Sequence, residues 1–164
     1  MSSFYLCAGF SARPYLQQVR DMLIAEGHAV TSRWLDCDVP GDERDHAHYA
    51  KWGPIDVEDV NAADIVILFT GLRGRKGGCD VEFGMGLALG KKLVIVGDRT
   101  NVFTRLPQVL QVSDAIELLL HFTPYPQYHL PEEGDRDEKH YATWVPVYGY
   151  DEPEPGAEQE VPDG

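Results

Sequence analysis

Short apolar runs alternate with helical patterns over the first 122 residues of the chain. Continuous apolar runs at 4–8, 65–69 and 93–96 predict strands, and the run IVILF at 65–69 is of the kind that is buried on both faces of a sheet. The segment 28–34 alternates and contains β-branched residues, so it predicts another strand, and 109–112 predicts a short fifth one.

Helical patterns fill the intervals between these runs. Apolar residues recur at helical spacing after Pro14, a residue that suits a first helical turn. A short helix is expected over 54–63, a helix of small residues over 79–89, and a last helix over 114–121 that Ser113 would cap.

The regular alternation of strands and helices predicts an α/β fold, an open parallel sheet of about five strands with helices on both faces. Ligands bind beyond the carboxyl ends of the strands in such sheets. The candidate binding segments are therefore 9–14, the long aperiodic stretch 34–53, and 70–82, which are rich in glycine, arginine, serine and aromatic residues.

The chain changes character after residue 122. Seven of its 11 prolines lie in 124–164, and an aromatic stretch over 125–150 precedes an acidic end over 151–164 that has the composition of a disordered segment. We expect one domain over 1–122 and a C-terminal extension over 123–164. The aromatic stretch either packs on the domain or a partner, or stays unpacked.

The formal charge of −13 belongs mostly to that extension, because residues 132–164 hold 11 of the 27 acidic residues and two of the 14 basic ones. The absence of a net basic footprint argues against a nucleic-acid partner. No apolar run approaches the length of a membrane span. The start of the chain lacks a basic, signal-like segment, so we expect a soluble cytoplasmic protein.

Cysteines and histidines give weak signals. The three cysteines, Cys7, Cys37 and Cys79, are widely spaced, which suggests neither a disulfide framework nor a zinc site, and Cys7 and Cys79 are expected to be small core or pocket residues. His46 and His48 form a single i, i+2 pair, so a metal site is not expected, and a substrate lid or a solvated loop is favoured there.

The segment 71–78 (GLRGRKGG) combines four glycines with Arg73, Arg75 and Lys76. Its backbone N–H groups could face one concavity beside the start of a helix, which would form an anion site. The alternative is a solvated basic loop, and the spacing fits neither a Walker motif nor GxGxxG.

Glu82 lies in the first turn of the following helix. It could simply complement the helix dipole. However, Gly84, Gly86, Ala88 and Gly90 make this helix thin, which lowers its stability and allows close approach of a backbone or a ligand. A carboxylate at the ligand edge of the sheet can act as a nucleophile or an electrostatic stabiliser at a sugar carbon.

Three segments, FYLCAGF at 4–10, NAADIVILFTG at 61–71 and GGCDVEFGMGLALGKKLVIVGDRTNVF at 77–103, resemble the nucleoside 2-deoxyribosyltransferase-like superfamily, which includes nucleotide N-glycosidases. The resemblance covers roughly residues 4–120. It implies a flavodoxin-like sheet, a site at the carboxyl edge, a homodimer or higher homo-oligomer that can share site residues, and no metal or organic cofactor.

The same resemblance assigns roles to residues. Glu82 matches the glutamate that attacks the anomeric carbon to form a covalent glycosyl intermediate, which a nucleobase (transferase) or water (hydrolase) then resolves. Tyr5 matches the tyrosine that orients this carboxylate, although a core aromatic is the alternative. The expected substrate-binding residues are Gly9, Phe10, Ser11, Arg13, Trp34, Lys76, Gly78 and Asn101, of which Trp34 could instead be a core residue.

The chain departs from the family pattern at two acidic positions, which are Thr70 and Lys76 here. The proton donor is therefore unassigned. Asp80 is a candidate, with a helix N-cap as the alternative. Basic residues in place of acids favour an anionic substrate such as a nucleoside 5′-monophosphate.

The expected function is therefore cleavage or transfer at the N-glycosidic bond of a (deoxy)nucleoside or its 5′-monophosphate, with a slight preference for the hydrolase. One alternative is a non-enzymatic nucleotide-binding or sensor module on the same fold. Another is a subunit whose acidic, aromatic extension recruits a basic partner or mimics nucleic acid.

Overall fold

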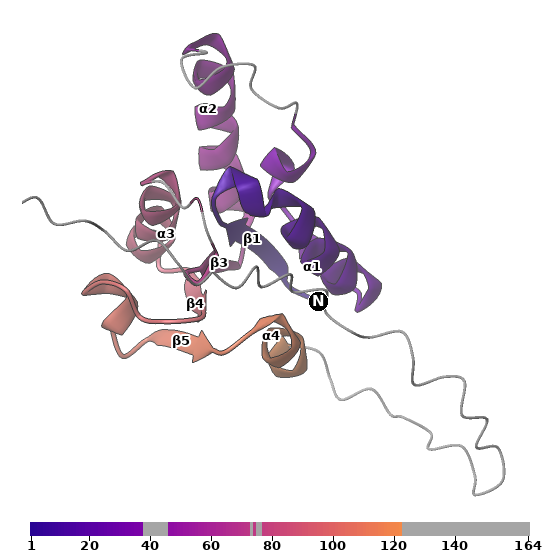
Figure 1. The fold of residues 1–164 in the computed structure, drawn as a ribbon, viewed down its shortest axis with the longest axis vertical. Helices are drawn as coiled ribbons and strands as arrows, with labels where there is room; N and C mark the ends of the chain where they lie inside the picture. Colours follow the sequence, from indigo (N-terminus) through magenta and orange to yellow (C-terminus); the bar gives the residue numbers. More distant parts are fainter. Residues whose placement is uncertain (38–45, 73, 75–76, 123–164) are drawn as a thin grey trace, which may run out of the picture. The chain divides into compact units, whose positions relative to one another are not determined.

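The computed structural model describes residues 1–37, 46–72, 74 and 77–122, so the expectations placed on 123–164 lie outside the described residues. Five parallel strands form one sheet in the order β2-β1-β3-β4-β5. They are β1 (Ser3–Cys7), β2 (Ala29–Val30), β3 (Ile65–Phe69), β4 (Lys92–Val96) and β5 (Val109–Val112). This is the flavodoxin-like order, and it confirms the predicted fold class (Figure 1).

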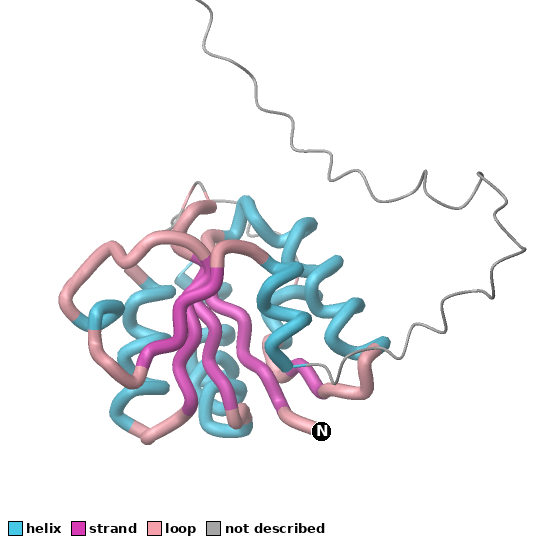
Figure 2. Tube along the Cα trace, turned by 90° about the horizontal axis from the view of Figure 1, so that it is seen from below, coloured by secondary structure: helices cyan, strands magenta, loops and turns pink. Residues whose placement is uncertain are grey.

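Helices cover both faces of the sheet, as Figure 2 shows. On one face α1 (Arg13–Ala25) contacts α4 (Ala115–Phe122), and on the other α2 (His46–Ala62) contacts α3 (Gly78–Ala88). Strands covered on both sides have no solvent-facing positions, which explains why all five residues of β3 are apolar and buried.

The register brings the carboxyl ends of the central strands to one edge. Cys7 of β1 pairs with Leu68 of β3, and Leu68 pairs with Ile95 of β4. The loops that follow these strands therefore start side by side, as the sequence predicted for the ligand-binding edge.

The second strand is shorter than the predicted 28–34. After Val30 the chain turns into a 3-10 helix, η2 (Arg33–Asp36). The Leu6 amide donates to the Ser32 hydroxyl at 2.6 Å instead of to a strand carbonyl, and the Arg33 amide donates to the Asp59 carboxylate at 2.9 Å. Side-chain oxygens thus accept backbone amides that would otherwise pair β1 with β2, and the strand ends early.

The helix predicted to begin at Pro54 begins at His46, so that prediction and the assignment of 46–53 to a loop are wrong. A proline inside a helix removes one hydrogen bond, which normally disfavours the turn before it. Here Trp52, which lies in that turn, is partly buried against the core, and this contact favours the helical conformation. The last helix, predicted over 114–121, is Ala115–Phe122, and its cap differs too, because Asp114 rather than Ser113 accepts the amides of Ile116 and Glu117, both at 2.9 Å.

The small residues of α3 let it lie close to the sheet. A Cβ on Gly86 would lie 2.8 Å from a methyl carbon of Val66 and 3.1 Å from one of Leu93, whereas a Cβ on Gly84 would meet nothing within 4 Å. Only Gly86 is therefore required for packing. Among the described residues, no helix is both long and apolar enough to cross a membrane.

We expect Gly86→Ala to lower the free energy of unfolding by about 1–3 kcal/mol, because the methyl group must displace two core side chains. Gly84→Ala, in the same helix, should instead raise it by about 0.5–1 kcal/mol through helix propensity. Urea unfolding of the two variants measures both. Equal effects would show that α3 does not rest on the sheet through Gly86.

Candidate active site

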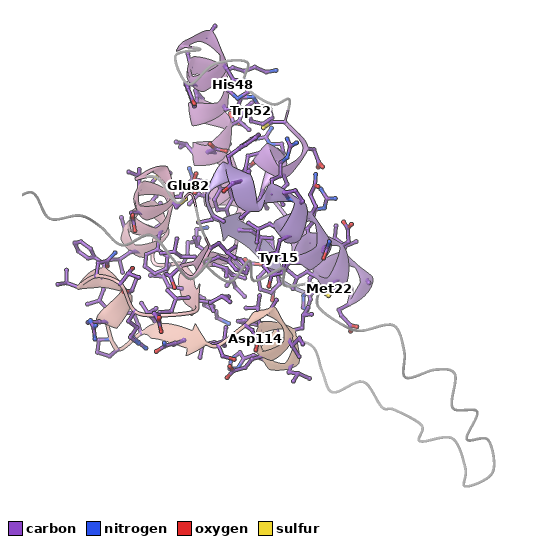
Figure 3. All side chains as sticks on the ribbon, viewed as in Figure 1. Tyr15, Met22, His48, Trp52, Glu82 and Asp114 are labelled. Atoms are coloured by element: carbon purple, nitrogen blue, oxygen red, sulfur yellow. The ribbon has the colours of Figure 1, made fainter. Side chains whose placement is uncertain are left out.

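Four polar side chains converge on the face of the sheet that α2 and α3 cover. Tyr5 and Cys7 come from β1, Asp56 from α2 and Glu82 from α3, and each interacts electrostatically with others of the set. Figure 3 shows Glu82 on the side of α3 that faces α2 and β1. Tyr5 and Cys7 share this face because alternate residues of a strand point the same way.

The position of Glu82 follows from how α3 packs. Glu82 lies four residues before Gly86, so both occupy the same side of the helix, the one against the sheet. Cys79, three residues earlier, is also buried on this side. The packing of the helix thus places the Glu82 side chain at the carboxyl ends of β1 and β3.

Tyr5 lies between the two carboxylates and is fully buried. Its hydroxyl interacts with both Glu82 and Asp56, yet a phenol has only one proton to donate. Among the described residues, neither the Tyr5 oxygen nor Asp56 Oδ1 has a partner at full hydrogen-bond geometry. Hydrogen-bonding capacity therefore remains for a ligand.

The pKa values of both carboxyl groups are raised toward neutral pH. Burial, and then repulsion by Asp56, raises the pKa of Glu82 to about 7. Burial and repulsion by Asp59 raise the pKa of Asp56 to about 6. Burial and the charge of Glu82 raise the pKa of the Tyr5 phenol well above its usual range, so it stays protonated. Between about pH 6 and 7 the two carboxyl groups hold about one proton between them, more of it on Glu82, which is an arrangement suited to acid–base chemistry.

Asp56 is the site residue that the sequence analysis missed. It lies in a run of acidic residues that looks like a solvated helix face. The available signal was spacing, because Asp56 falls between Trp52 and Val60 on the inward stripe of α2. An acid on an apolar stripe is a candidate functional residue.

Asp80, the sequence candidate for the proton donor, is not placed beside Glu82. It lies on another side of α3, where it borders a groove of about 500 Å³ with Val81, Phe83, Gly84, Leu87, Asn101, Val102 and Phe103. It is not an N-cap either, because α3 begins at Gly78 with Gly77 as its cap.

Asn101 belongs to the same groove. Its Nδ2 donates to Asp80 Oδ1 at 3.4 Å. Its Oδ1 accepts the amides of Phe103 and Thr104 at 2.9 and 3.0 Å, which shapes the turn η3 (Phe103–Arg105). The structure thus shows a loop-forming role for Asn101.

The first loop lies at the carboxyl edge, as predicted. It contains Gly9 and the 3-10 turn η1 (Phe10–Ala12), and Arg13 begins α1. The guanidinium of Arg13 lies 4.8 Å from the centre of the Phe10 ring and donates to the Cys37 carbonyl at 2.5 Å.

The glycine-rich loop approaches this first loop. Gly74 has a positive φ of 76°, and a side chain there would collide with the Ser11 hydroxyl. Gly78 lies at the exposed start of α3. Arg73, Arg75 and Lys76 lie outside the described residues, so the anion site expected there stays a prediction.

Trp34 is almost entirely buried, and its indole N–H donates to the Leu6 carbonyl at 2.9 Å. Its ring lies 6.4 Å from that of Phe10. These contacts match the core alternative more closely than a base-stacking role. In the part of the chain that the structure describes, no group of three His, Cys, Asp or Glu side chains could hold a metal ion.

The raised pKa of Glu82 predicts a pH-dependent stability. The folded chain binds this proton more tightly than the unfolded chain, where the carboxyl ionises near 4.5. The contribution of Glu82 to the free energy of unfolding should therefore be fully present below about pH 4.5 and be lost as the pH rises through about 7. Glu82→Gln should flatten this slope and stabilise the protein at pH 8 by on the order of 2 kcal/mol.

Chemical denaturation from pH 4 to 8 checks this expectation. Glu26→Gln, at the exposed end of α1, is the matched control and should change the free energy of unfolding little at any pH. An unchanged slope in Glu82→Gln would refute the burial of a charged Glu82.

Solved structures share this arrangement of elements. A 2-deoxyribosyltransferase from Bacillus psychrosaccharolyticus superposes with a TM-score of 0.57 at 21% identity, over 71% of this chain and 90% of that one. The CMP N-glycosidase BcmB of Clostridium botulinum gives 0.50 at 17% identity, over 73% and 96%. A conserved protein from Enterococcus faecalis V583 gives 0.51 at 14% identity, over 73% and 96%.

No protein-family profile and no curated protein sequence matches the chain. The likeness is therefore one of three-dimensional structure, and it confirms the fold that the resemblance of segments 4–10, 61–71 and 77–103 implied. The chain therefore has the flavodoxin-like α/β fold that these three solved proteins share.

Proposed function

We propose that the protein cleaves or transfers at the N-glycosidic bond of a (deoxy)nucleoside or a nucleoside 5′-monophosphate, through a covalent glycosyl intermediate on Glu82. The observation that carries this proposal is the pair of partly buried carboxyl groups, Glu82 and Asp56, that both interact with the buried Tyr5 hydroxyl at the carboxyl edge of the sheet. The pair offers a nucleophile and an acid within one site.

In the first step, a Glu82 carboxylate oxygen attacks the anomeric carbon and forms a carbon–oxygen bond. The bond from that carbon to the base nitrogen breaks, and its electron pair goes to the base, which takes the proton of Asp56. The anionic form of Glu82 also stabilises the positive charge that develops on the sugar. Asp56 replaces Asp80 as our candidate donor, because Asp56 interacts with Tyr5 beside Glu82.

In the second step, the Asp56 carboxylate accepts a proton from water as the water oxygen attacks the anomeric carbon. This frees Glu82 and releases the sugar, and attack by a nucleobase would instead give a new nucleoside. Tyr5 donates its one proton to whichever carboxylate carries the charge, so it can follow the charge between the two residues.

The names of the structural neighbours support this chemistry, because one is a 2-deoxyribosyltransferase and another a CMP N-glycosidase. We place the leaving base near Asp56, where Trp52, one turn earlier on α2 and partly buried, offers an aromatic face. The Arg13 guanidinium has further donors beyond its bond to the Cys37 carbonyl, which suits a 5′-phosphate. Cytoplasmic location and homo-oligomeric assembly stay predictions.

Incubation with a panel of nucleosides and 5′-monophosphates, with and without an acceptor base, tests the proposal. We expect the wild type to release free base and Glu82→Ala to lose at least about 10³-fold in rate, because the nucleophile is gone. Chromatography of the products also separates hydrolysis from transfer. Binding without release of any base would support the sensor alternative.

The pH profile distinguishes the two candidate proton donors. The wild-type kcat/KM should be bell-shaped with a narrow optimum between about pH 6 and 7, because Glu82 must be ionised and Asp56 protonated, which is the minority form of a pair with pKa values of about 7 and about 6. Asp56→Asn should lose the alkaline limb and most of the rate on substrates with poor leaving groups. Asp80→Asn, the matched control on the far side of the site, should keep both limbs, and the opposite result would restore Asp80 as the donor.

A further inference from the structure

The segment that follows β2 is attached to β1 on both sides of Tyr5. The Thr31 amide donates to the Phe4 carbonyl at 2.8 Å, and the Ser32 hydroxyl accepts the Leu6 amide at 2.6 Å. Phe4 and Leu6 are the two neighbours of Tyr5 along the strand. The segment is therefore fixed to β1 at the level of the Tyr5 side chain.

The same segment also holds α2, through Asp59. The Thr31 hydroxyl donates to the Asp59 carbonyl at 2.9 Å. One oxygen of the Asp59 carboxylate accepts the Arg33 amide at 2.9 Å, and the other accepts the Arg33 guanidinium at 2.6 Å. The guanidinium donates to Glu58 as well, at 2.9 Å. These bonds fix this turn of α2 relative to the segment, and through it relative to β1.

The two members of this ion pair differ in their exposure to water. Asp59 is only 4% exposed, whereas the Arg33 side chain is 53% exposed. Water screens the charge of an exposed group much more than that of a buried one. The positive charge of Arg33 therefore does not fully cancel the negative charge of Asp59 on the inner side of α2.

Asp56 lies three residues before Asp59, so the two side chains are neighbours on one face of the helix. Among the described residues, the buried Oδ1 of Asp56 has no partner at full hydrogen-bond geometry. The position of this carboxyl group is therefore set mainly by the helix that carries it. Since like charges at this spacing repel, a second negative charge at Asp56 is disfavoured.

We propose that Arg33 and Asp59 are positioning residues for Asp56. They fix the turn of α2 that carries it, and the negative charge of Asp59 favours its protonated form, the form that can give a proton to the leaving base. The benefit to the reaction rests on the proposed function, but the position and the charge preference exist in the free protein. The pKa of Asp56 agrees, because burial and then Asp59 raise it to about 6, while Tyr5 and Arg33 lower it.

Several charged or titratable groups interact with Asp56. They are Tyr5 and Cys7 on β1, Arg33 on η2, Asp59 on α2 and Glu82 on α3. Arg33 and Asp59 carry opposite charges, so neutralising one or the other should move the titration of Asp56 in opposite directions. A general loosening of α2 would not produce such a pair of opposite shifts.

Asp59→Asn removes the negative charge and keeps an acceptor for Arg33. We expect it to lower the midpoint of the Asp56 titration by about 0.5–1 unit, because the repulsion is gone. Arg33→Gln removes the cation and keeps the backbone amide that bonds Asp59. It should raise the midpoint, by a smaller amount because the guanidinium is half exposed. On the alkaline limb, Asp59→Asn should lower kcat/KM by about 3- to 10-fold.

The midpoint can be read without turnover, from the carboxyl ¹³C resonance of Asp56 in the free, aspartate-labelled protein, assigned by its loss in Asp56→Asn. Glu58→Gln is the matched control, because Glu58 also bonds Arg33 at 2.9 Å but its side chain is 70% exposed. We expect this control to leave the Asp56 titration in place.

The proposal is overturned if Asp59→Asn and Arg33→Gln shift the midpoint in the same direction or leave it in place, or if Glu58→Gln shifts it as much as Asp59→Asn. Should Asp59→Asn not fold, Arg33→Gln decides alone, and an unchanged or lowered midpoint refutes the proposal. Because the titration needs no substrate, opposite shifts together with an inactive wild type would leave this proposal standing and remove only the proposed function.

Discussion

The removal of Glu82 from water is the constraint on which the site depends. A carboxyl group that is withdrawn from water beside a second carboxylate is costly to ionise, and this cost raises the pKa values of both groups toward neutral pH. Among the described residues, no basic side chain is a cause of the raised Glu82 pKa; burial and repulsion by Asp56 raise it, and Tyr5 and Cys7 lower it. Desolvation and the second carboxylate therefore dominate the electrostatics of the site.

The raised pKa values of Glu82 and Asp56 require that α3 and α2, which carry them, pack on the sheet at defined positions. Gly86 lets α3 lie against Val66, which sets the height of Glu82 over β1. On α2, the buried Asp59 accepts the Arg33 side chain at 2.6 Å and the Arg33 amide at 2.9 Å, which ties the helix to η2. One turn away on α2, Asp56 then faces Tyr5. Packing and ion pairing distant from the reacting atoms therefore determine their geometry.

The site also illustrates how one strand can serve two carboxylates. Tyr5 and Cys7 are alternate residues of β1 on one face of the sheet, and both interact with Glu82 and with Asp56. Strands buried on both faces have few polar positions, so each polar side chain on such a strand must find its partner within the site.

Much of the fold could be predicted from local pattern, because apolar runs and helical spacing report burial directly. Segments 4–8 and 65–69 predicted the two central strands. Segment 77–103 predicted the helix that carries Glu82 and gave Glu82 as the candidate nucleophile. The sequence by itself thus determined the alternation of elements and the edge where chemistry would lie. Only the tertiary structure decided that Asp56 rather than Asp80 accompanies Glu82, because partners 26 residues apart meet through helix packing, which no local spacing records. It also decided that β2 ends early and that α2 passes through Pro54, since side-chain hydrogen bonds and core contacts overrode local propensity there.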